Sequence, residues 1–491
     1  MASWESGSRG QTVSGVRSNR HRVTGYNLRT DIPADGAMLN LEGEIHMKPT
    51  ITYALLLTAN LWFWTAGGNT QAAERASPEA AGETAAQKEA RLHWWRQARF
   101  GMFIHWGPVS LKGTEISWSR ANTNPKCPNH GPIPAKVYDN LYRQFNPRQF
   151  DANRWVAVAK GAGMKYVVLT AKHCDGFLLW RSALSDYNIS ATPFHRDVCG
   201  ELAAAARRHG LRIGWYFSPM DWRDPDFRTQ HNAAFVGRMQ GELRELLGNY
   251  GRIDLLWFDW DGGQPLYDQA QTYRLVSQLQ PRIIIDNRLD LGPGNNDRRI
   301  LSPYADYYTP EQQLGGYDDR RPWETCMTLG TQWAWKPGDA LKSKAEVLRT
   351  LACCAGGDGN LLLNVGPMPD GRIEPRQAEV LGDVGQWLRR NGESIYGTRG
   401  GPYKPTSSLA STRKGNAIYL HLLKPASRLT LPPIPRKVRG AAFLDGRRVV
   451  VAQTIEGISL DIPAAETVDG DTVIKLDLDG SAMDIPATPA G

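Results

Sequence analysis

Residues 154–176 have the sequence RWVAVAKGAGMKYVVLTAKHCDG, in which a helical pattern is followed by a strand pattern. Residues 154–162 are amphipathic with the apolar spacing of a helix, and residues 166–170 form a short apolar run typical of a strand buried on both faces. Two polar residues, Lys172 and His173, follow where that strand ends. A helix, a buried strand and a polar strand end in succession indicate a parallel α/β sheet.

The same alternation of helical and strand patterns extends over residues 87–399. Eight segments have strand character: 102–106, 166–170, 213–217, 254–258, 283–286, 306–309, 325–328 and 361–365. Helical patterns lie between them, for example at residues 201–209 and 233–247. Eight alternations favour a closed (β/α)8-like barrel over an open sheet. Because the segments around the sixth and seventh strands are rich in loop residues, we expect this barrel to be irregular.

The pattern changes after residue 400. Four further runs have strand character: 416–423, 442–444, 448–451 and 472–479. Asp445 and Gly446 lie between two of these runs, as expected for a hairpin turn. Residues 400–491 are therefore expected to form a small C-terminal antiparallel β-sandwich.

The composition is that of a globular protein. Of the 491 residues, 41% are hydrophobic and 22% are charged, which excludes a largely disordered or fibrous chain. The net charge is +8, but no run of five Lys and Arg occurs, and five Arg lie in the Ser- and Gly-rich residues 1–46. We therefore expect no nucleic-acid partner.

A targeting signal is expected at residues 47–72. Met47 and Lys48 precede an apolar stretch at residues 51–65, and small residues follow it. A charged start, an apolar region of about 7–15 residues and small residues at a cleavage site are typical of a secretory signal. Since such a signal belongs at an N-terminus, we expect residues 1–46 to be a disordered or over-called extension.

Export of the chain follows from this interpretation. We expect a signal that starts near Met47, a linker at residues 73–86, and a periplasmic, secreted or lysosome-like location with no stable membrane span after signal removal. An uncleaved anchor is the alternative, although the apolar stretch is shorter than the roughly 20 residues of a spanning helix.

The sequence lacks the motifs that are typical of several kinds of metal, nucleophile and nucleotide site. The six cysteines form no CxxC pair, which argues against a structural zinc site. The histidines form no HxH or HExxH pair, and their spacing neither supports nor excludes a metal. We expect no metal and no other cofactor. Neither GxSxG, nor GxGxxG, nor a P-loop occurs. Their absence disfavours a serine hydrolase of the α/β type and a dinucleotide- or phosphate-binding fold.

Polar and aromatic residues recur where the expected barrel strands end, which is where such barrels carry their sites. These residues are His105, His173, Tyr216, Asp259, Arg288, Tyr307, Tyr308, Glu311, Trp333 and Trp335. Each alone has a structural alternative, such as a core histidine or a carboxylate at a helix N-terminus. Glycoside hydrolases use two carboxyl groups that flank the scissile bond. Two carboxylates in a cup of aromatic residues and hydroxyl-binding polar groups therefore favour glycoside hydrolysis.

Five blocks of the chain resemble glycoside hydrolase family 29, the α-L-fucosidases. They are FGMFIHWG at 100–107, AKHCDGFLLW at 171–180, LWFD at 256–259, WETCMT at 323–328 and NLLLNVGPMPDGR at 360–372. The blocks follow the family's order and cover the whole barrel region. The resemblance implies a retaining, exo-acting α-L-fucosidase with an irregular barrel and a C-terminal β-sandwich, acting on fucosylated oligosaccharides or glycans.

The resemblance also implies roles for single residues. Asp259 would be the nucleophile, and the sugar would be contacted by His105, Trp118, His173, Tyr216, Arg288 and Trp333. Two positions depart from the family pattern. Cys174 stands where the family has a second histidine, and Ser117 stands where it has a glutamate before Trp118, which leaves Glu115 as a candidate substitute.

The general acid/base is assigned to Glu311, with Glu324 as the alternative. Glu311 lies in a Thr-Pro-Glu segment resembling the branch of the family that is strict for branched fucosyl linkages, and Glu324 lies inside the WETCMT block. A loop carboxylate can reach a leaving group more readily than one embedded in a strand. Two other functions stay open: a fucose-binding protein without catalysis, and a glycosidase of the same mechanism that acts on α-L-galactosides.

Overall fold

The computed structural model describes residues 83–121, 131–259, 266–290, 304–463 and 470–490. All of these residues belong to one compact unit, Glu74–Gly491. The expected extension at 1–46, the expected signal at 47–72 and most of the expected linker at 73–86 therefore lie outside the described residues.

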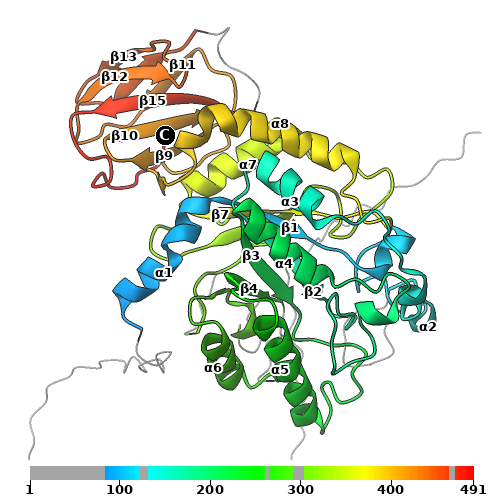
Figure 1. Ribbon diagram of the computed structural model, residues 1–491. Coiled ribbons are helices and arrows are strands. Elements are labelled where there is room, and N and C mark those ends of the chain that lie inside the picture. The colour runs from blue at the N-terminus through cyan, green and yellow to red at the C-terminus, as the bar shows by residue number, and fades with distance from the viewer. Residues whose placement is uncertain (1–82, 122–130, 260–265, 291–303, 464–469, 491) are drawn as a thin grey trace, which may run out of the picture. The chain divides into compact units, whose positions relative to one another are not determined.

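Seven parallel strands form the central sheet, in the order β5-β4-β3-β2-β1-β7-β6 (Figure 1). They are β1 (Phe100–Ile104), β2 (Tyr166–Lys172), β3 (Arg212–Phe217), β4 (Leu255–Phe258), β5 (Ile284–Ile285), β6 (Glu324–Thr328) and β7 (Asn360–Val365). Within these seven strands only Arg212 is not buried, as expected for a parallel sheet covered on both faces. The parallel α/β architecture expected from the sequence is confirmed.

The sixth expected strand, at residues 306–309, is not a regular strand in the structure. Its backbone pairs first with one neighbour and then with the other, because the amide of Asp306 donates to Ile285 and that of Tyr308 donates to Pro322. Isolated parallel bridges join Asp286 to Tyr307, Tyr308 to Trp323 and Glu311 to Cys326. A segment that changes partner after two residues builds no ladder, but residues 306–311 span the gap between β5 and β6 in the curled sheet.

Helices cover the outer face of the sheet (Figure 1). They are α3 (Ala152–Gly161), α4 (Val198–His209), α5 (Asn232–Gly248), α6 (Gln269–Leu279), α7 (Lys344–Gly356) and α8 (Pro375–Asn391), with the short α2 (Ala135–Tyr138) in a connecting loop. Side-chain caps fix where several of them begin: Asp151 accepts from two amides of α3, and Ser343 forms a capping box with Glu346 in α7.

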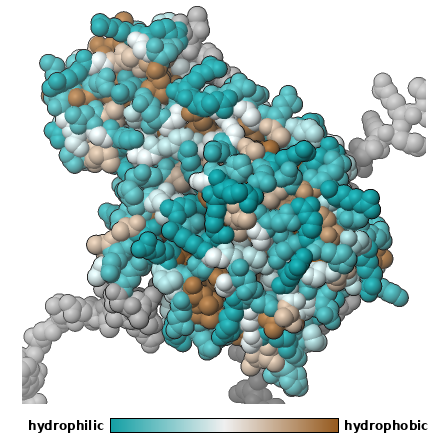
Figure 2. Space-filling model, in the orientation of Figure 1, coloured by the Kyte–Doolittle hydropathy of each residue, from teal (hydrophilic) through white to brown (hydrophobic). Residues whose placement is uncertain are grey.

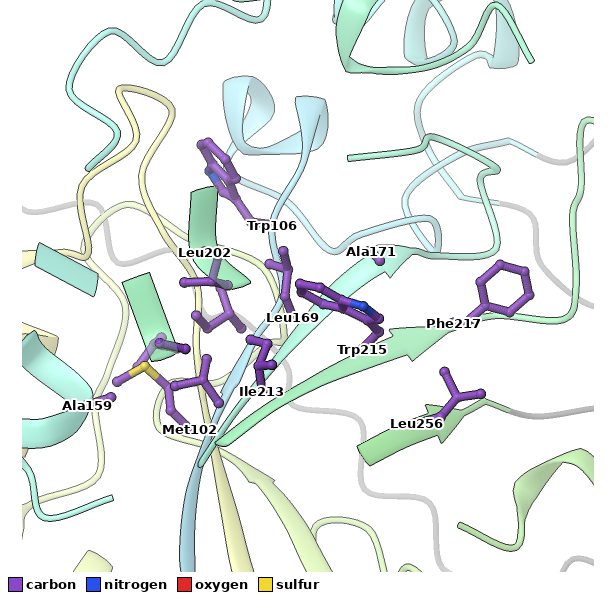
Figure 3. Packing of buried hydrophobic residues seen from close by; sticks show 14 of the residues in the cluster. Met102, Trp106, Ala159, Leu169, Ala171, Leu202, Ile213, Trp215, Phe217 and Leu256 are labelled. Atoms are coloured by element: carbon purple, nitrogen blue, oxygen red, sulfur yellow. The ribbon is translucent and has the colours of Figure 1, made fainter. Parts of the chain in front are cut away.

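Alternate side chains of each strand point to the helices. Leu169 and Ile213 of β2 and β3 lie in one apolar cluster with Ala159 of α3 and Leu202 of α4, as Figure 3 shows. The other side chains point into the barrel and form a second cluster, which includes Phe103, Tyr216 and Trp257. This period of two is that of a strand with two buried faces.

Helix α1 (Ala85–Ala98) packs against the interior of the barrel at the end where the strands begin. Its residues Leu92, Trp95 and Ala98 belong to the interior cluster. Arg91 of the same helix binds Asp306 at 2.7 Å and the carbonyl of Ile283 at 2.8 Å. The helix therefore closes one end of the barrel and leaves the strand C-termini as the open end.

The C-terminal part contains two antiparallel sheets, as expected for a sandwich. Their orders are β12-β15-β10-β9-β8 and β11-β14-β13. The strands are β8 (Arg399–Gly400), β9 (Leu409–Lys414), β10 (Ala417–Leu422), β11 (Arg428–Leu431), β12 (Val438–Phe443), β13 (Val450–Gln453), β14 (Ile458–Asp461) and β15 (Thr472–Leu478). The amide of Gly446, at φ +90°, donates to Phe443, which confirms the turn expected at Asp445 and Gly446.

No helix in the described ranges is long and apolar enough to cross a membrane. The face drawn in Figure 2 is mostly hydrophilic, with hydrophobic residues scattered over it. The five cysteines that the structure describes, at positions 174, 199, 326, 353 and 354, are free and buried.

Candidate active site

Two histidines lie at the ends of β1 and β2. His105 binds Asn364 of β7 through Nδ1 at 2.7 Å, and His173 binds Ser117 through Nδ1 at 2.6 Å. Their rings are 5.9 Å apart between centroids, and both side chains are buried. Burial, helped by the charge that His173 would carry, lowers the pKa of His105 to about 3, and burial also lowers the pKa of His173. Both rings are therefore neutral, with nitrogens suited to sugar hydroxyls.

Tyr216 connects the histidines to the expected nucleophile. Its ring stacks on that of His173, with centroids 5.3 Å apart, and on that of Trp257 at 5.5 Å. Its hydroxyl donates a hydrogen bond to Oδ2 of Asp259. Burial and the charge of Asp259 raise the pKa of Tyr216 well above its ordinary value, so the hydroxyl keeps the proton that it donates.

Arg288 binds both expected catalytic carboxylates. Its Nη1 lies 3.0 Å from Oδ1 of Asp259, and its Nη2 lies 3.0 Å from Oε2 of Glu311. The guanidinium is 1% exposed and lies 4.3 Å from the ring centroid of Trp257. Thr309, the last residue of the expected sixth strand, accepts two further hydrogen bonds from the guanidinium. The nucleophile candidate and the acid/base candidate are thus held on one cation.

Trp333 lies over His105 at a centroid distance of 4.7 Å. The amides of Trp333 and Ala334 donate to the carboxylate of Glu115 at 2.8 and 3.2 Å, and the carbonyl of Trp333 accepts from Asn364. Glu115 therefore holds the loop that carries Trp333. This contact leaves its carboxylate occupied by backbone groups, so the structure does not support Glu115 as the substitute for the sugar-binding glutamate.

Ser117 lies beside His173, and the next residue, Trp118, packs against a different side chain. The hydroxyl of Ser117 contacts His173 and also accepts from the amide of Asp175 at 2.9 Å, at a backbone φ of +54°. The adjacent Trp118 is partly buried and packs edge-on against Trp222 at 5.3 Å. The serine that replaces the family glutamate thus orients a histidine, a contact that the sequence did not predict.

Lys172 is the last residue of β2 and directly precedes His173, but its side chain points away from the cup around Asp259. Its ammonium is buried and binds Glu242 at 2.7 Å and Asp221 at 3.0 Å. The two carboxylates raise its pKa against the opposing effect of burial, and burial raises the pKa of Glu242 to about 7. This buried cluster anchors the segment that carries His173. Its acidic members come from a loop and from α5, so no strand-end pattern could have found them.

Glu324 lies at the start of β6, the end of the strand opposite the cup. Its side chain is fully buried, and Oε2 accepts hydrogen bonds from Tyr166 and from Trp95 of α1. The ring of Trp257 contacts Arg288. The same side chain also lies close to Glu324 and acts to lower the pKa of its carboxyl. Burial raises that pKa to about 7. Glu311, in contrast, has a side chain that is 25% exposed.

A barrel whose strand ends carry two carboxylates in an aromatic, hydroxyl-binding cup defines a glycoside hydrolase. The sequence matches the family model described as Alpha-L-fucosidase over residues 68–393. The chain therefore belongs to the α-L-fucosidase family, glycoside hydrolase family 29, as its sequence blocks indicate.

Curated relatives and solved structures agree with this family. Plasma alpha-L-fucosidase of Rattus norvegicus is 34% identical over 332 residues, 62% of this chain and 70% of that protein. Tissue alpha-L-fucosidase of Homo sapiens is 31% identical over 359 residues, 66% of this chain and 74% of that protein. Alpha-L-fucosidase isoenzyme 1 from Paenibacillus thiaminolyticus has a TM-score of 0.72 and 35% identity, and the match covers 80% of this chain and 99% of that one.

A further structural match bears on the mechanism. It is a GH29 α-L-fucosidase from Bacteroides thetaiotaomicron, trapped as a covalent intermediate in complex with 2-fluoro-fucosyl fluoride. Its TM-score is 0.70 at 26% identity, with 80% of this chain and 96% of that chain covered. A covalent intermediate is the mark of retention. This chain is accordingly a retaining, exo-acting α-L-fucosidase, and the prediction of that function is confirmed.

The buried carboxyl of Glu324 predicts a pH-dependent stability. Its pKa is raised from an ordinary 4.5 to about 7, so between these values the folded chain keeps a proton that the unfolded chain releases. The stability from this group is fully present below pH 4.5 and is lost as the pH rises through 7. Glu324→Gln cannot ionise, so its free energy of unfolding, relative to the wild type, should rise by up to about 3 kcal/mol between about pH 5 and 8.

Denaturant unfolding of both proteins at the two pH values measures this difference. Glu379→Gln, on the exposed face of α8, is the control for the chemical change and should show no such trend. A difference between Glu324→Gln and the wild type that stays constant with pH would contradict the assignment.

Proposed function

We propose that Asp259 is the nucleophile and Glu311 the general acid/base of this fucosidase. Asp259 attacks the anomeric carbon of the terminal fucose while Glu311 protonates the departing glycosidic oxygen. Glu311 then removes a proton from water, which attacks the same carbon and releases Asp259. The supporting observation is the shared contact with Arg288, because retention needs two carboxyls only about 5–5.5 Å apart and one guanidinium binds both at 3.0 Å.

The shared cation also couples the two steps. In the free enzyme Arg288 is paired with two carboxylates. When Asp259 becomes an ester it loses its charge, and Glu311 is then the one of these two carboxyls that can still neutralise Arg288. A nearby cation favours the ionised form of a carboxyl, and the ionised form is the base that the second step requires. Arg288 would thus help Glu311 change from acid to base.

The cup around Asp259 is proposed to recognise the sugar. His105, His173 and Tyr216 carry polar atoms at its floor, and the neutral histidines can each donate or accept a hydrogen bond. Trp333 and Trp118 are only partly buried and have rings that can cover the methyl and apolar face of fucose. The substrate class is a fucosylated oligosaccharide or glycan.

Exposure favours Glu311 over Glu324 as the acid/base. The acid must reach an oxygen that leaves with the rest of the glycan, and Glu311 is 25% exposed whereas Glu324 is 0% exposed. Glu324 is also engaged by Tyr166 and Trp95 at the closed end of the barrel. We assign Glu324 to positioning of the barrel interior.

We also propose that the enzyme is exported through the signal at residues 47–72. The support is the charged, apolar and small-residue pattern, together with relatives named plasma alpha-L-fucosidases. Mass spectrometry of the exported protein should find an N-terminus near Ala73, because the signal is removed. An exported protein that retains Met1 would contradict the proposal.

Asp259→Ala should lower turnover by about 10³-fold or more, because no covalent intermediate can form. Added azide should restore part of the turnover, since a small anion fits the space of the lost carboxylate. Asp445→Ala, in an exposed turn, is the matched control and should keep its activity with no response to azide. Near-normal turnover of Asp259→Ala, with the fold intact by circular dichroism, would overturn the assignment.

Glu311→Gln should slow hydrolysis of natural fucosyl oligosaccharides far more than that of an activated aryl fucoside. General acid/base help is typically worth 10²–10⁴-fold, and a phenolate leaves without it. Glu324→Gln should instead lower kcat/KM for both substrates by the same factor. If the leaving-group dependence appears in Glu324→Gln and not in Glu311→Gln, the two roles are reversed.

A further inference from the structure

Three side chains of different donor type meet at the floor of the cup. A ring nitrogen of His173, the sulfur of Cys174 and a carboxylate oxygen of Asp259 all lie within 4.8 Å of one another. His173 and Cys174 follow β2, whereas Asp259 follows β4 two strands away. A fixed cluster of one nitrogen, one sulfur and one oxygen donor is a ligand set that suits Zn²⁺.

The surroundings of the cluster resemble the outer shell of a metal site. The Nδ1 of His173 is occupied by the hydroxyl of Ser117 at 2.6 Å, which fixes the ring and leaves Nε2 as the nitrogen for a metal. The sulfur of Cys174 lies 3.2 Å from the hydroxyl of Ser218.

The cluster is also accessible from one side. His173 and Cys174 are buried, but the side chain of Asp259 is 16% exposed. An ion that enters the cup therefore meets the carboxylate first and the nitrogen and sulfur behind it. Three protein ligands with one open position is the arrangement of an exchangeable rather than a structural zinc site.

We propose that Zn²⁺ binds His173, Cys174 and Asp259 and thereby inhibits the enzyme. The ion would bind the carboxylate of the nucleophile and occupy the floor of the cup, so it would exclude the fucosyl group. The selectivity is for borderline and soft cations, because the sulfur ligand disfavours Mg²⁺ and Ca²⁺. The inhibitory part of this inference rests on the proposed role of Asp259, whereas the binding part rests only on the cluster.

The kinetic test is inhibition of the full-length enzyme by Zn²⁺ with an aryl fucoside as substrate. Inhibition should be competitive, reversed by EDTA and absent with Mg²⁺. Loss of an outer-shell partner costs about 10–100-fold in metal affinity, so Cys174→Ser, which loses a ligand, should weaken inhibition at least tenfold. Cys353→Ser, a buried cysteine elsewhere in the fold, is the matched control and should be inhibited like the wild type.

Equal inhibition of Cys174→Ser and the wild type would overturn the proposal, as would the absence of any inhibition by Zn²⁺. A second measurement does not depend on activity: Co²⁺ added to the wild type should produce a thiolate-to-metal charge-transfer band, and added L-fucose should reduce it. Cys174→Ser should show no band, and a wild type without the band would also contradict the site.

The two proposals fail in different ways. If azide does not rescue Asp259→Ala but the cobalt band appears, the nucleophile assignment fails and the metal site stands. If azide rescues that variant and the band is missing, the metal site alone fails.

Discussion

The buried positive charge of Arg288 is the constraint on which the site depends. Its guanidinium is 1% exposed and packs over Trp257, so it must be neutralised within the protein. Removing one partner of a buried ion pair costs about 3–5 kcal/mol. Asp259, Glu311 and Thr309 bind it, and the sulfur of Cys326 lies 3.7 Å from its Nη2. The contacts that stabilise the cation are therefore also those that bring the two carboxylates together.

The irregular side of the barrel follows from the same constraint. Residues 306–311 pair with β5 at one end and with the β6 side at the other, which carries Thr309 and Glu311 across the gap to Arg288. Thr309 and Glu311 are two residues apart, and in an extended segment such side chains point to the same side. Both reach one guanidinium, Thr309 with its hydroxyl and its carbonyl and Glu311 with its carboxylate. Glu311, the acid/base candidate, therefore lies in the segment where the barrel is irregular.

Much of this arrangement could be predicted from the sequence, because buried strands are apolar on both faces and polar residues at their ends stand out. His105, His173, Tyr216, Asp259, Arg288, Glu311 and Trp333 all come from that pattern, and the structure joins them by direct contacts. The pattern failed at residues 306–309, where strand propensity was present but pairing partners changed. It also could not show that Glu115 binds backbone amides, that Ser117 orients His173, or that α1 closes the barrel, because these contacts join segments distant in sequence.

Asp259 is proposed to form the covalent fucosyl-enzyme. The most direct measurement is to inactivate the enzyme with 2-fluoro-fucosyl fluoride, digest it and locate the labelled residue by mass spectrometry. The fluorine at carbon 2 slows release of the sugar, so the ester accumulates. We expect one adduct per chain, on the peptide that contains Asp259, and no labelling of Asp259→Ala. An adduct on Glu311, Glu324 or another carboxylate would contradict it.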